Sequence, residues 1–334
     1  MVSKKYIEEI KHGGFRSFIR RAIRCGVKVR IIFEQPRVLV LSYKQKSIVC
    51  VGDCIPVFKR SSDTATRNKA VTKAALASIG ISTPRGILAT TYTELKRKMV
   101  GVRLKYPLIA KPLDQGFAQG VTWNIQSEAE LRKAVAYIRE TSLKPAGQQQ
   151  SFLVEEMAAG EEYRVLIFKR TILSCVKKLP AIVTGDGHSS IRELVDSFNK
   201  KRSRGFELKI DAVVKESLRS AGLTLQSILP NGYAQKLRNN LNMSDGGRSI
   251  ECTHLLSERL RKICILALDV LGMNYGGIDI ITPSLTSPLA PYVILEVNPL
   301  PYYNMHEKPL VEGVGVDVSG ILLKELFPSL KIDQ

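Results

Sequence analysis

The sequence predicts an α+β protein, with two mixed lobes behind a short N-terminal α/β cap. Helical periods, as in residues 68–79 and 127–139, alternate with short β-branched runs. A length of 334 residues with 44% hydrophobic content is enough for the cores of two or three domains. The Gln, Pro and Gly residues of the stretch 144–150 indicate a connection between two lobes. The expected division is a cap at 1–60, a first lobe at 61–150, and a second lobe at 151–334 with a helical insertion at about 185–235.

The net charge of +19 is concentrated at the start of the chain. Residues 1–60 hold fourteen Lys and Arg against four Asp and Glu. Arg16, Arg20 and Arg24 are spaced four apart, so the helix expected at 15–25 has a basic outer face opposite an apolar one. No aromatic residues are interleaved with these charges and no binding motif accompanies them, which argues against nucleic acid as a partner. We expect a solvated face, or one that attracts anionic small molecules.

Composition also bears on location and redox state. The longest apolar runs, such as 263–268, are too short to span a bilayer, and the N-terminus lacks an apolar segment with a cleavage site, so a cytoplasmic protein is expected. Six cysteines without C-x-x-C pairs, beside only four histidines, favour buried free thiols over disulfides or zinc. No convincing Ser/His/Asp or Cys/His set indicates nucleophilic catalysis.

The cap is expected to contain a helix followed by three strands. Gly26 follows the helix and is a typical C-terminal stop. Apolar runs at 27–33, 37–43 and 47–51 then predict strands joined by short polar turns.

In the first lobe, two lysines stand beside backbone that favours anions. Lys69 lies in the first turn of the first helix of this lobe, where the helix N-terminus attracts negative charge. Lys111 closes the strand 108–111 before a loop with Gly116 and Gly120, so an ammonium group and several N–H groups could surround phosphates. On spacing alone, a solvated surface lysine and an ordinary hairpin turn remain open alternatives.

An acidic turn follows the apolar strand 152–155. Glu156 and Met157 lead into a small-residue turn that ends at Glu162. In such a hinge the backbone and Glu155 could read the edge of an adenine, and Glu162 a ribose diol. A plain surface turn is the alternative.

Three oxygen-bearing side chains lie in two apolar runs near the C-terminus. Glu296 and Asn298 are two residues apart in the strand predicted at 293–297, so both point to one face. Asp279 lies in a second predicted strand, 278–281. Carboxylate and amide oxygens suit Mg²⁺, although the same residues could merely cap or edge a sheet.

The order of these motifs resembles the ATP-grasp superfamily of carboxylate–amine ligases over about residues 15–310. The motifs are N-K before a helix, I-A-K-P, a Gly-rich loop, L-V-E-E-M, G-G-I-D-I and L-E-V-N-P. The run V-T-G-D-G-H-S-S-I-R-E-L-V at 183–195 and the stretch 245–253 are similar to the ATP-grasp modules of cyanophycin synthetase and of the bifunctional glutathione-synthesising enzyme. The resemblance implies the ATP-grasp fold, in which two α+β lobes grip ATP.

The resemblance also implies roles for individual residues. Lys177 and Lys178 stand where the subgroup places arginines against the phosphoryl groups, and Arg248 could stabilise an acyl-phosphate. The implied catalytic residues are therefore Arg248 and Lys177. The positions assigned to ATP are Lys69, Lys111, Gly116, Gly120, Glu155, Glu156, Met157 and Glu162, and those assigned to magnesium are Asp279, Glu296 and Asn298.

The implied reaction is the ATP-dependent joining of a carboxylate to an amine through an acyl-phosphate, with release of ADP and phosphate. The expected cofactors are ATP and Mg²⁺, with Mn²⁺ as a possible substitute, and the expected partners are amino acids or short peptides. A homo-oligomer is compatible with the sequence. The alternative is an inactive ATP-grasp protein that binds nucleotide or acts as a scaffold.

The chain departs from the subgroup after the magnesium asparagine. Cyanophycin synthetase has a small turn there, whereas this chain has Tyr302 and Tyr303. We expect these tyrosines, with Arg248 and His306, to select an anionic amino acid or peptide. His188, in the V-T-G-D-G turn, is expected to be structural.

Overall fold

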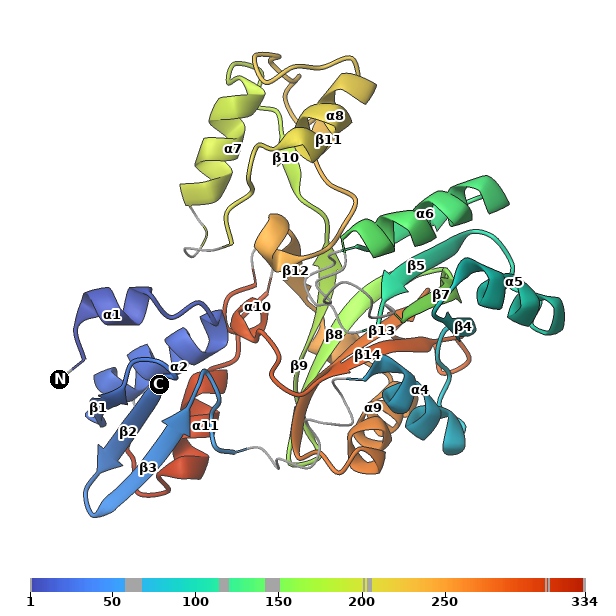
Figure 1. The fold of residues 1–334 in the computed structure, drawn as a ribbon. Coiled ribbons are helices and arrows are strands. Elements are labelled where there is room, and N and C mark those ends of the chain that lie inside the picture. Colours follow the sequence, from blue (N-terminus) through green and yellow to red (C-terminus); the bar gives the residue numbers. More distant parts are fainter. Residues whose placement is uncertain are drawn as a thin grey trace. The chain divides into compact units, whose positions relative to one another are not determined.

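The computed structural model describes residues 2–57, 68–113, 120–141, 151–200, 202, 206–309, 311 and 313–332. The chain forms two compact units. Figure 1 labels the helices and strands of both. Unit 1 comprises residues 1–57, 173–254 and 300–334, and unit 2 comprises residues 58–172 and 255–299.

The first part of unit 1 contains both the N-terminal and the C-terminal segments of the chain. Helix α2 packs against α11, and the antiparallel strands follow the order β1-β2-β3. The three strands are confirmed to within one residue of their expected bounds, and Gly26 follows the helix with a φ of +80°. The elements are α1 (Lys4–Glu8), α2 (Gly13–Arg24), β1 (Lys28–Phe33), β2 (Val38–Tyr43), β3 (Lys46–Val51), α10 (Asn304–Glu307) and α11 (Val318–Leu326).

The prediction of a basic outer face on helix α2 is wrong at one position. Arg16 is only 5% exposed. Its guanidinium donates to the carbonyl oxygens of Glu8 and Ile10, at 3.4 and 3.3 Å. The segment around α1 therefore covers Arg16 and supplies the acceptors that its burial requires.

The second part of unit 1 corresponds to the expected helical insertion. Segment 191–229 contains two helices with an apolar cluster beneath them that includes Val195, Val214 and Leu229. The chain enters unit 1 within β9, which pairs antiparallel with β12, and β10 pairs with β11. The elements are β9 (Thr171–Leu179), β10 (Ile182–Thr184), α7 (Ile191–Lys200), α8 (Ala212–Ser220), β11 (Ala234–Lys236), β12 (Arg248–Glu251) and the 3₁₀ turns Met243–Asp245 and Thr253–Leu255.

Unit 2 contains a four-stranded antiparallel sheet in the order β4-β7-β5-β6. Its core joins apolar residues of these strands to residues of α5 and α6, including Leu95 and Val135. Ser127 caps α6 by accepting from the Glu130 N–H, and the Glu130 carboxylate accepts from the Gln126 N–H, one residue before the N-cap that a capping box would use. The elements are β4 (Gly86–Ala89), α5 (Tyr92–Gly101), β5 (Leu108–Pro112), β6 (Thr122–Ile125), α6 (Glu128–Glu140) and β7 (Phe152–Glu156).

Three further strands of unit 2 pair antiparallel in the order β8-β13-β14. Helix α9 packs against β13, and α4 packs against β14 and α9. The elements are α4 (Lys69–Ser78), β8 (Glu161–Phe168), α9 (Glu258–Val270), β13 (Tyr275–Thr282) and β14 (Val293–Asn298). The expected helix 68–79 and strands 108–111 and 152–155 are confirmed within the scatter of such boundaries.

All six cysteines are free thiols, and four of them are buried, as expected. No helix in the described part of the chain is long and apolar enough to cross a membrane.

Candidate functional site

The three predicted magnesium ligands share one face of the β13 and β14 pair. Asp279 lies directly opposite Glu296, and Asn298 lies opposite Gly277. Because directly opposed residues point to the same face, and residues two apart on a strand do so too, all three side chains project together. The Asn298 amide donates to Glu296 Oε1 at 2.9 Å.

No sequence pattern predicts a role for Arg164, yet it is the main partner of Asp279. It lies opposite Asp279 on β8, and its guanidinium forms a bidentate contact with that carboxylate. Asp279 is 2% exposed and Arg164 is 9% exposed. Burial disfavours the guanidinium charge, but the neighbouring carboxylates outweigh burial and raise the pKa of Arg164.

This donor set fits a hard cation. Glu296 is partly exposed and lies 3.6 Å from the Arg164 guanidinium. A carboxylate that accepts one guanidinium keeps further lone pairs, so Asp279, Glu296 and the Asn298 oxygen remain suitable for Mg²⁺. Among the described residues, no group of three His, Cys, Asp or Glu side chains is arranged to hold a metal. The candidate set instead has two carboxylates and one amide.

A buried carboxylate with two ammonium groups forms the second cluster of unit 2. Glu155 on β7 is 1% exposed. Lys111 from β5 pairs with its Oε2, and Lys73 from α4 pairs with its Oε1. Lys111 is thus placed at the end of its strand as predicted, whereas Lys73 was missed. The sequence signal that could have found it is its position one turn after Lys69.

Two further nucleotide candidates, Lys69 and Gly120, lie at or near the ends of elements. Lys69 occupies the first turn of α4, whose N-terminus is capped by the Asn68 side chain through the N–H groups of residues 70 and 71. Gly120 has a φ of +68°. Gly116, with most of the loop 114–121, lies outside the described residues, as does the connection 144–150.

Two residues of the predicted hinge, Glu156 and Met157, accept hydrogen bonds from neighbouring segments. The Glu156 carboxylate accepts from the Lys105 N–H at 2.8 Å, and the Met157 sulfur from the Asn124 N–H at 3.2 Å. Glu162 lies on β8, two residues before Arg164 and therefore on the same face.

The predicted catalytic residues of unit 1 share one face of the β9 and β12 pair. Lys177 lies opposite Ile250, and Arg248 lies opposite Leu179, so both side chains are on the partly exposed face. Lys178 lies opposite Ser249 on the buried face. The two adjacent lysines therefore point in opposite directions, and only Lys177 accompanies Arg248.

Arg248 follows a turn that other side chains hold closed. Arg202 donates to the carbonyl oxygens of Met243 and Gly247, at 2.9 and 2.7 Å. At Gly247 a Cβ would lie 2.5 Å from the Leu241 carbonyl oxygen, so the turn closes only with glycine there. Burial lowers the pKa of Arg248. Burial is also the largest cause that lowers the pKa of Arg202 to about 10, and the nearby charge of Arg248 adds to this shift.

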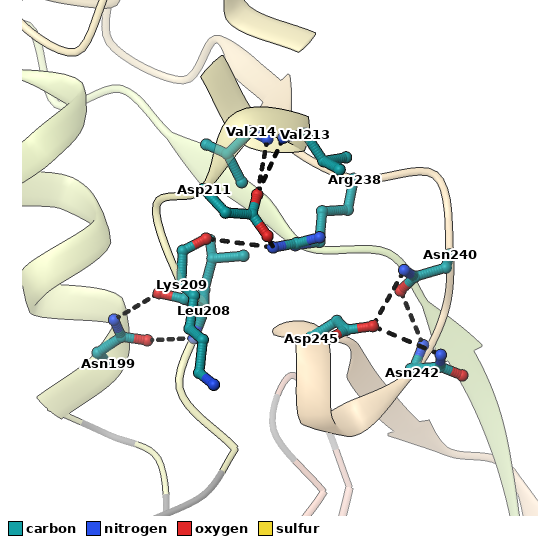
Figure 2. A network of polar contacts seen from close by, with 10 residues as sticks. All are labelled: Asn199, Leu208, Lys209, Asp211, Val213, Val214, Arg238, Asn240, Asn242 and Asp245. Carbon is teal, nitrogen blue, oxygen red and sulfur yellow. Dashed lines mark hydrogen bonds and ion pairs between the residues drawn. The ribbon is translucent and has the colours of Figure 1, made fainter. Parts of the chain in front are cut away.

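Figure 2 shows how the segments around this turn are tied together. Asp211 caps α8 through the N–H groups of Val213 and Val214, and it also accepts from Arg238. The Asp245 carboxylate accepts from Asn240 at 3.1 Å. These contacts hold the stretch that leads to Arg248 in one arrangement.

The expected substrate role of Tyr303 and His306 is wrong, because both are core residues. Tyr303 is 1% exposed and donates from its hydroxyl to the Gly14 carbonyl oxygen at 2.5 Å. His306 is fully buried, with Nδ1 2.9 Å from the Ser174 hydroxyl. Tyr302 is half-buried and stacks on His12, with ring centroids 4.3 Å apart. Of these residues, only Tyr302 and Arg248 keep part of their side chains accessible.

Comparisons with known proteins agree with the arrangement of these residues. The ATP-grasp domain family matches residues 104–177. Cyanophycin synthetase of Trichormus variabilis is 30% identical over 271 residues, which cover 78% of this chain and 29% of that protein. The glutathione biosynthesis bifunctional protein GshAB of Enterococcus faecalis is 28% identical over 336 residues, covering 94% of this chain and 42% of that protein.

A solved structure shows the same fold. The bifunctional glutathione synthetase from Pasteurella multocida superposes with a TM-score of 0.70 over 98% of this chain and 44% of that chain, at 23% identity. The chain thus spans less than half the length of these relatives. The comparisons confirm the resemblance to the ATP-grasp superfamily and to these two kinds of enzyme.

Proposed function

Since the chain has the ATP-grasp fold, we propose that it is an ATP-dependent carboxylate–amine ligase that releases ADP and phosphate. The observation that carries the proposal is the face shared by Asp279, Glu296 and Asn298. A chain that had lost phosphoryl chemistry would have no need of three convergent oxygen ligands beside a buried arginine.

The described residues divide the work in this proposal. Asp279, Glu296 and Asn298 would hold Mg²⁺, which neutralises phosphate charge when bound. Lys111 and Lys69 would place ammonium groups on the phosphates, and Glu162 would bind the ribose. The reacting carboxylate attacks the γ-phosphate, and ADP leaves as the acyl-phosphate forms. The amine then attacks the acyl carbon, displaces phosphate and gives up a proton to water. These steps need positioning and charge stabilisation rather than a nucleophilic side chain.

The substrates proposed are an anionic amino acid or short peptide and an amine of similar size. Lys177 and Arg248 present two cations on one face of a strand pair, which suits a carboxylate or an acyl-phosphate. The names of the similar proteins, cyanophycin synthetase and GshAB, support substrates of this class. Mn²⁺ would substitute for Mg²⁺, because it accepts the same oxygen donors.

We also propose that the protein works in the cytoplasm, which the six free thiols support. A homo-oligomer remains a prediction, to be measured by analytical ultracentrifugation.

The test is ADP release from the purified chain with Mg²⁺ and ATP, screened against amino acids and acidic dipeptides in pairs. Stimulation by one acid and one amine together, with the joined product detected by mass spectrometry, is the expected result. Tight ATP binding without product from any pair would favour the alternative of an inactive nucleotide-binding protein. If the chain neither binds ATP nor forms a product, both the ligase and the nucleotide-binding alternative are rejected.

A further inference from the structure

Lys73 connects three elements of unit 2. It lies on α4 one turn after Lys69, so the two side chains are on the same side of the helix. Its ammonium group donates to the Pro84 carbonyl oxygen, just before β4, and to Glu155 on β7. One side chain therefore ties the helix that carries Lys69 to the sheet that carries Lys111.

The backbone makes room for this contact at Gly86. Gly86 lies directly opposite Glu155 in the β4 and β7 pair. A Cβ at Gly86 would lie 2.6 Å from Glu155 Cγ and 2.8 Å from the Val154 carbonyl oxygen. Because glycine leaves this space open, the Glu155 side chain can take its present position, in which it meets both lysines.

The charges in this cluster do not cancel. Two ammonium groups share one carboxylate, and that carboxylate is almost completely excluded from water. Burial lowers the pKa of Lys73, Glu155 opposes this shift and Lys111 adds to it. One positive charge is therefore left over beside a strand end, where an anion would be stabilised.

We propose that Lys73 is a positioning residue for the nucleotide: by occupying Oε1 of Glu155 it leaves Oε2 to direct Lys111, and it fixes α4 so that Lys69 is presented with it. This inference depends on the proposed function, because it assumes that Lys69 and Lys111 bind the phosphates of ATP. Without Lys73, both carboxylate oxygens of Glu155 are free to hold Lys111. The positive charge of Lys111 is then no longer available to a phosphate.

The experiment compares Lys73→Met with Lys73→Arg and with Lys98→Met in the full chain. Lys98 is a matched control, because it is an exposed lysine that pairs with Glu94 within α5 of the same unit. Calorimetry with Mg²⁺ and a non-hydrolysable ATP analogue measures affinity, and steady-state assays separate KM for ATP from kcat. Thermal unfolding shows whether each variant is folded.

We expect Lys73→Met to weaken analogue binding at least about tenfold, as for the loss of a charge-assisted contact, with KM rising more than kcat falls. Lys73→Arg should recover most of the affinity, and Lys98→Met should bind as the unaltered protein does. Wild-type affinity in a folded Lys73→Met protein would overturn the inference. So would a Lys73→Arg variant as weak as Lys73→Met.

Gly86→Ala tests the same point with Lys73 intact. The added Cβ displaces Glu155, so analogue binding should weaken here too, and unchanged affinity would overturn the inference even if Lys73→Met did not fold. A failure of the unaltered protein to bind the analogue is a different outcome, because it would reject the proposed function itself, and the inference with it.

Discussion

Asp279 and Glu296 lie directly opposite each other on β13 and β14, and Arg164 faces Asp279 from β8 on the other side. Asp279, Glu296 and Arg164 together carry one negative charge next to the Asn298 amide, and Glu162 on the same face adds a second. Arg164 compensates the buried carboxylate, whereas Glu296 is more accessible. The two carboxylates should therefore respond differently to substitution.

Replacing Glu296 should affect activity rather than folding. Glu296→Gln keeps the shape of the side chain but removes a charged oxygen ligand. ADP formation should fall by about 100-fold or more, in the range seen when one electrostatic contact to a transition state is lost. The free energy of unfolding should change by no more than about 0.5 kcal/mol, as for most surface substitutions. Raising the Mg²⁺ concentration should restore part of the rate, and full activity at low Mg²⁺ would remove Glu296 from the metal site.

Replacing Arg164 should destabilise unit 2. Arg164→Met leaves Asp279 as an uncompensated buried charge, which costs about 3–5 kcal/mol in comparable cases. Urea unfolding measures the change, and the double variant Arg164→Met with Asp279→Asn should recover much of it. Arg170 pairs with Asp269 at an exposed position, so Arg170→Met is the control, with a loss of about 1 kcal/mol or less. Equal losses for the two single variants would contradict the role given to the buried pair.

The pH dependence of unit 1 should come partly from His12. Nδ1 of His12 accepts from the Phe15 N–H as the N-cap of α2, and Nε2 lies 3.4 Å from the Leu300 carbonyl oxygen. Burial lowers the pKa of His12, with the Leu300 carbonyl and Asp53 opposing the shift. A protonated Nδ1 cannot accept the capping bond, so the unfolded state binds protons first as pH falls. The contribution of His12 to the free energy of unfolding is therefore fully present above about pH 6.5. It is lost as the pH falls below that value toward the lowered pKa of the folded protein.

Thermal unfolding between pH 5 and 7.5 checks this prediction. His12→Asn keeps a capping oxygen that does not titrate, so its midpoint should vary less over this range than that of the unaltered protein. Parallel curves for the two proteins would show that His12 is not responsible.

The two adjacent tyrosines should separate stability from specificity. Tyr303→Phe removes the hydroxyl that contacts Gly14 and Ser319 and should cost about 1 kcal/mol, while Tyr303→Ala leaves a cavity and should cost roughly 3–5 kcal/mol. Tyr302→Ala should cost less, since Tyr302 is half-buried. Once a substrate pair is found, only Tyr302→Ala should change its preference. A shift in preference with Tyr303→Phe would contradict the assignment of Tyr303 to the core.

Local patterns predicted much of the fold and part of the candidate site. The strands of the cap, the stop at Gly26 and the shared face of Glu296 and Asn298 depend on periods of two or 3.6 residues, or on one glycine conformation. Such features are set by neighbours in the chain, so they can be read without knowing what packs where. The order of motifs carried the resemblance for the same reason.

The tertiary structure decided what each charged side chain meets. Arg16 has the spacing of a surface residue, but carbonyl groups from the α1 segment bury it. Glu155 looked like part of an exposed hinge, yet it is enclosed by Lys73 and Lys111, which come from two other elements. His306 and Tyr303 follow β14 in sequence but are core residues.

The sequence by itself therefore determined the elements, the fold family and which side chains share a face of a strand, because backbone geometry repeats over a few residues. Only the tertiary structure decided that Asp279 is paired with Arg164, that Lys73 and Lys111 hold one carboxylate, and that Lys177 rather than Lys178 accompanies Arg248. Burial and pairing depend on residues distant in the chain, and the free energy of a charge depends on both.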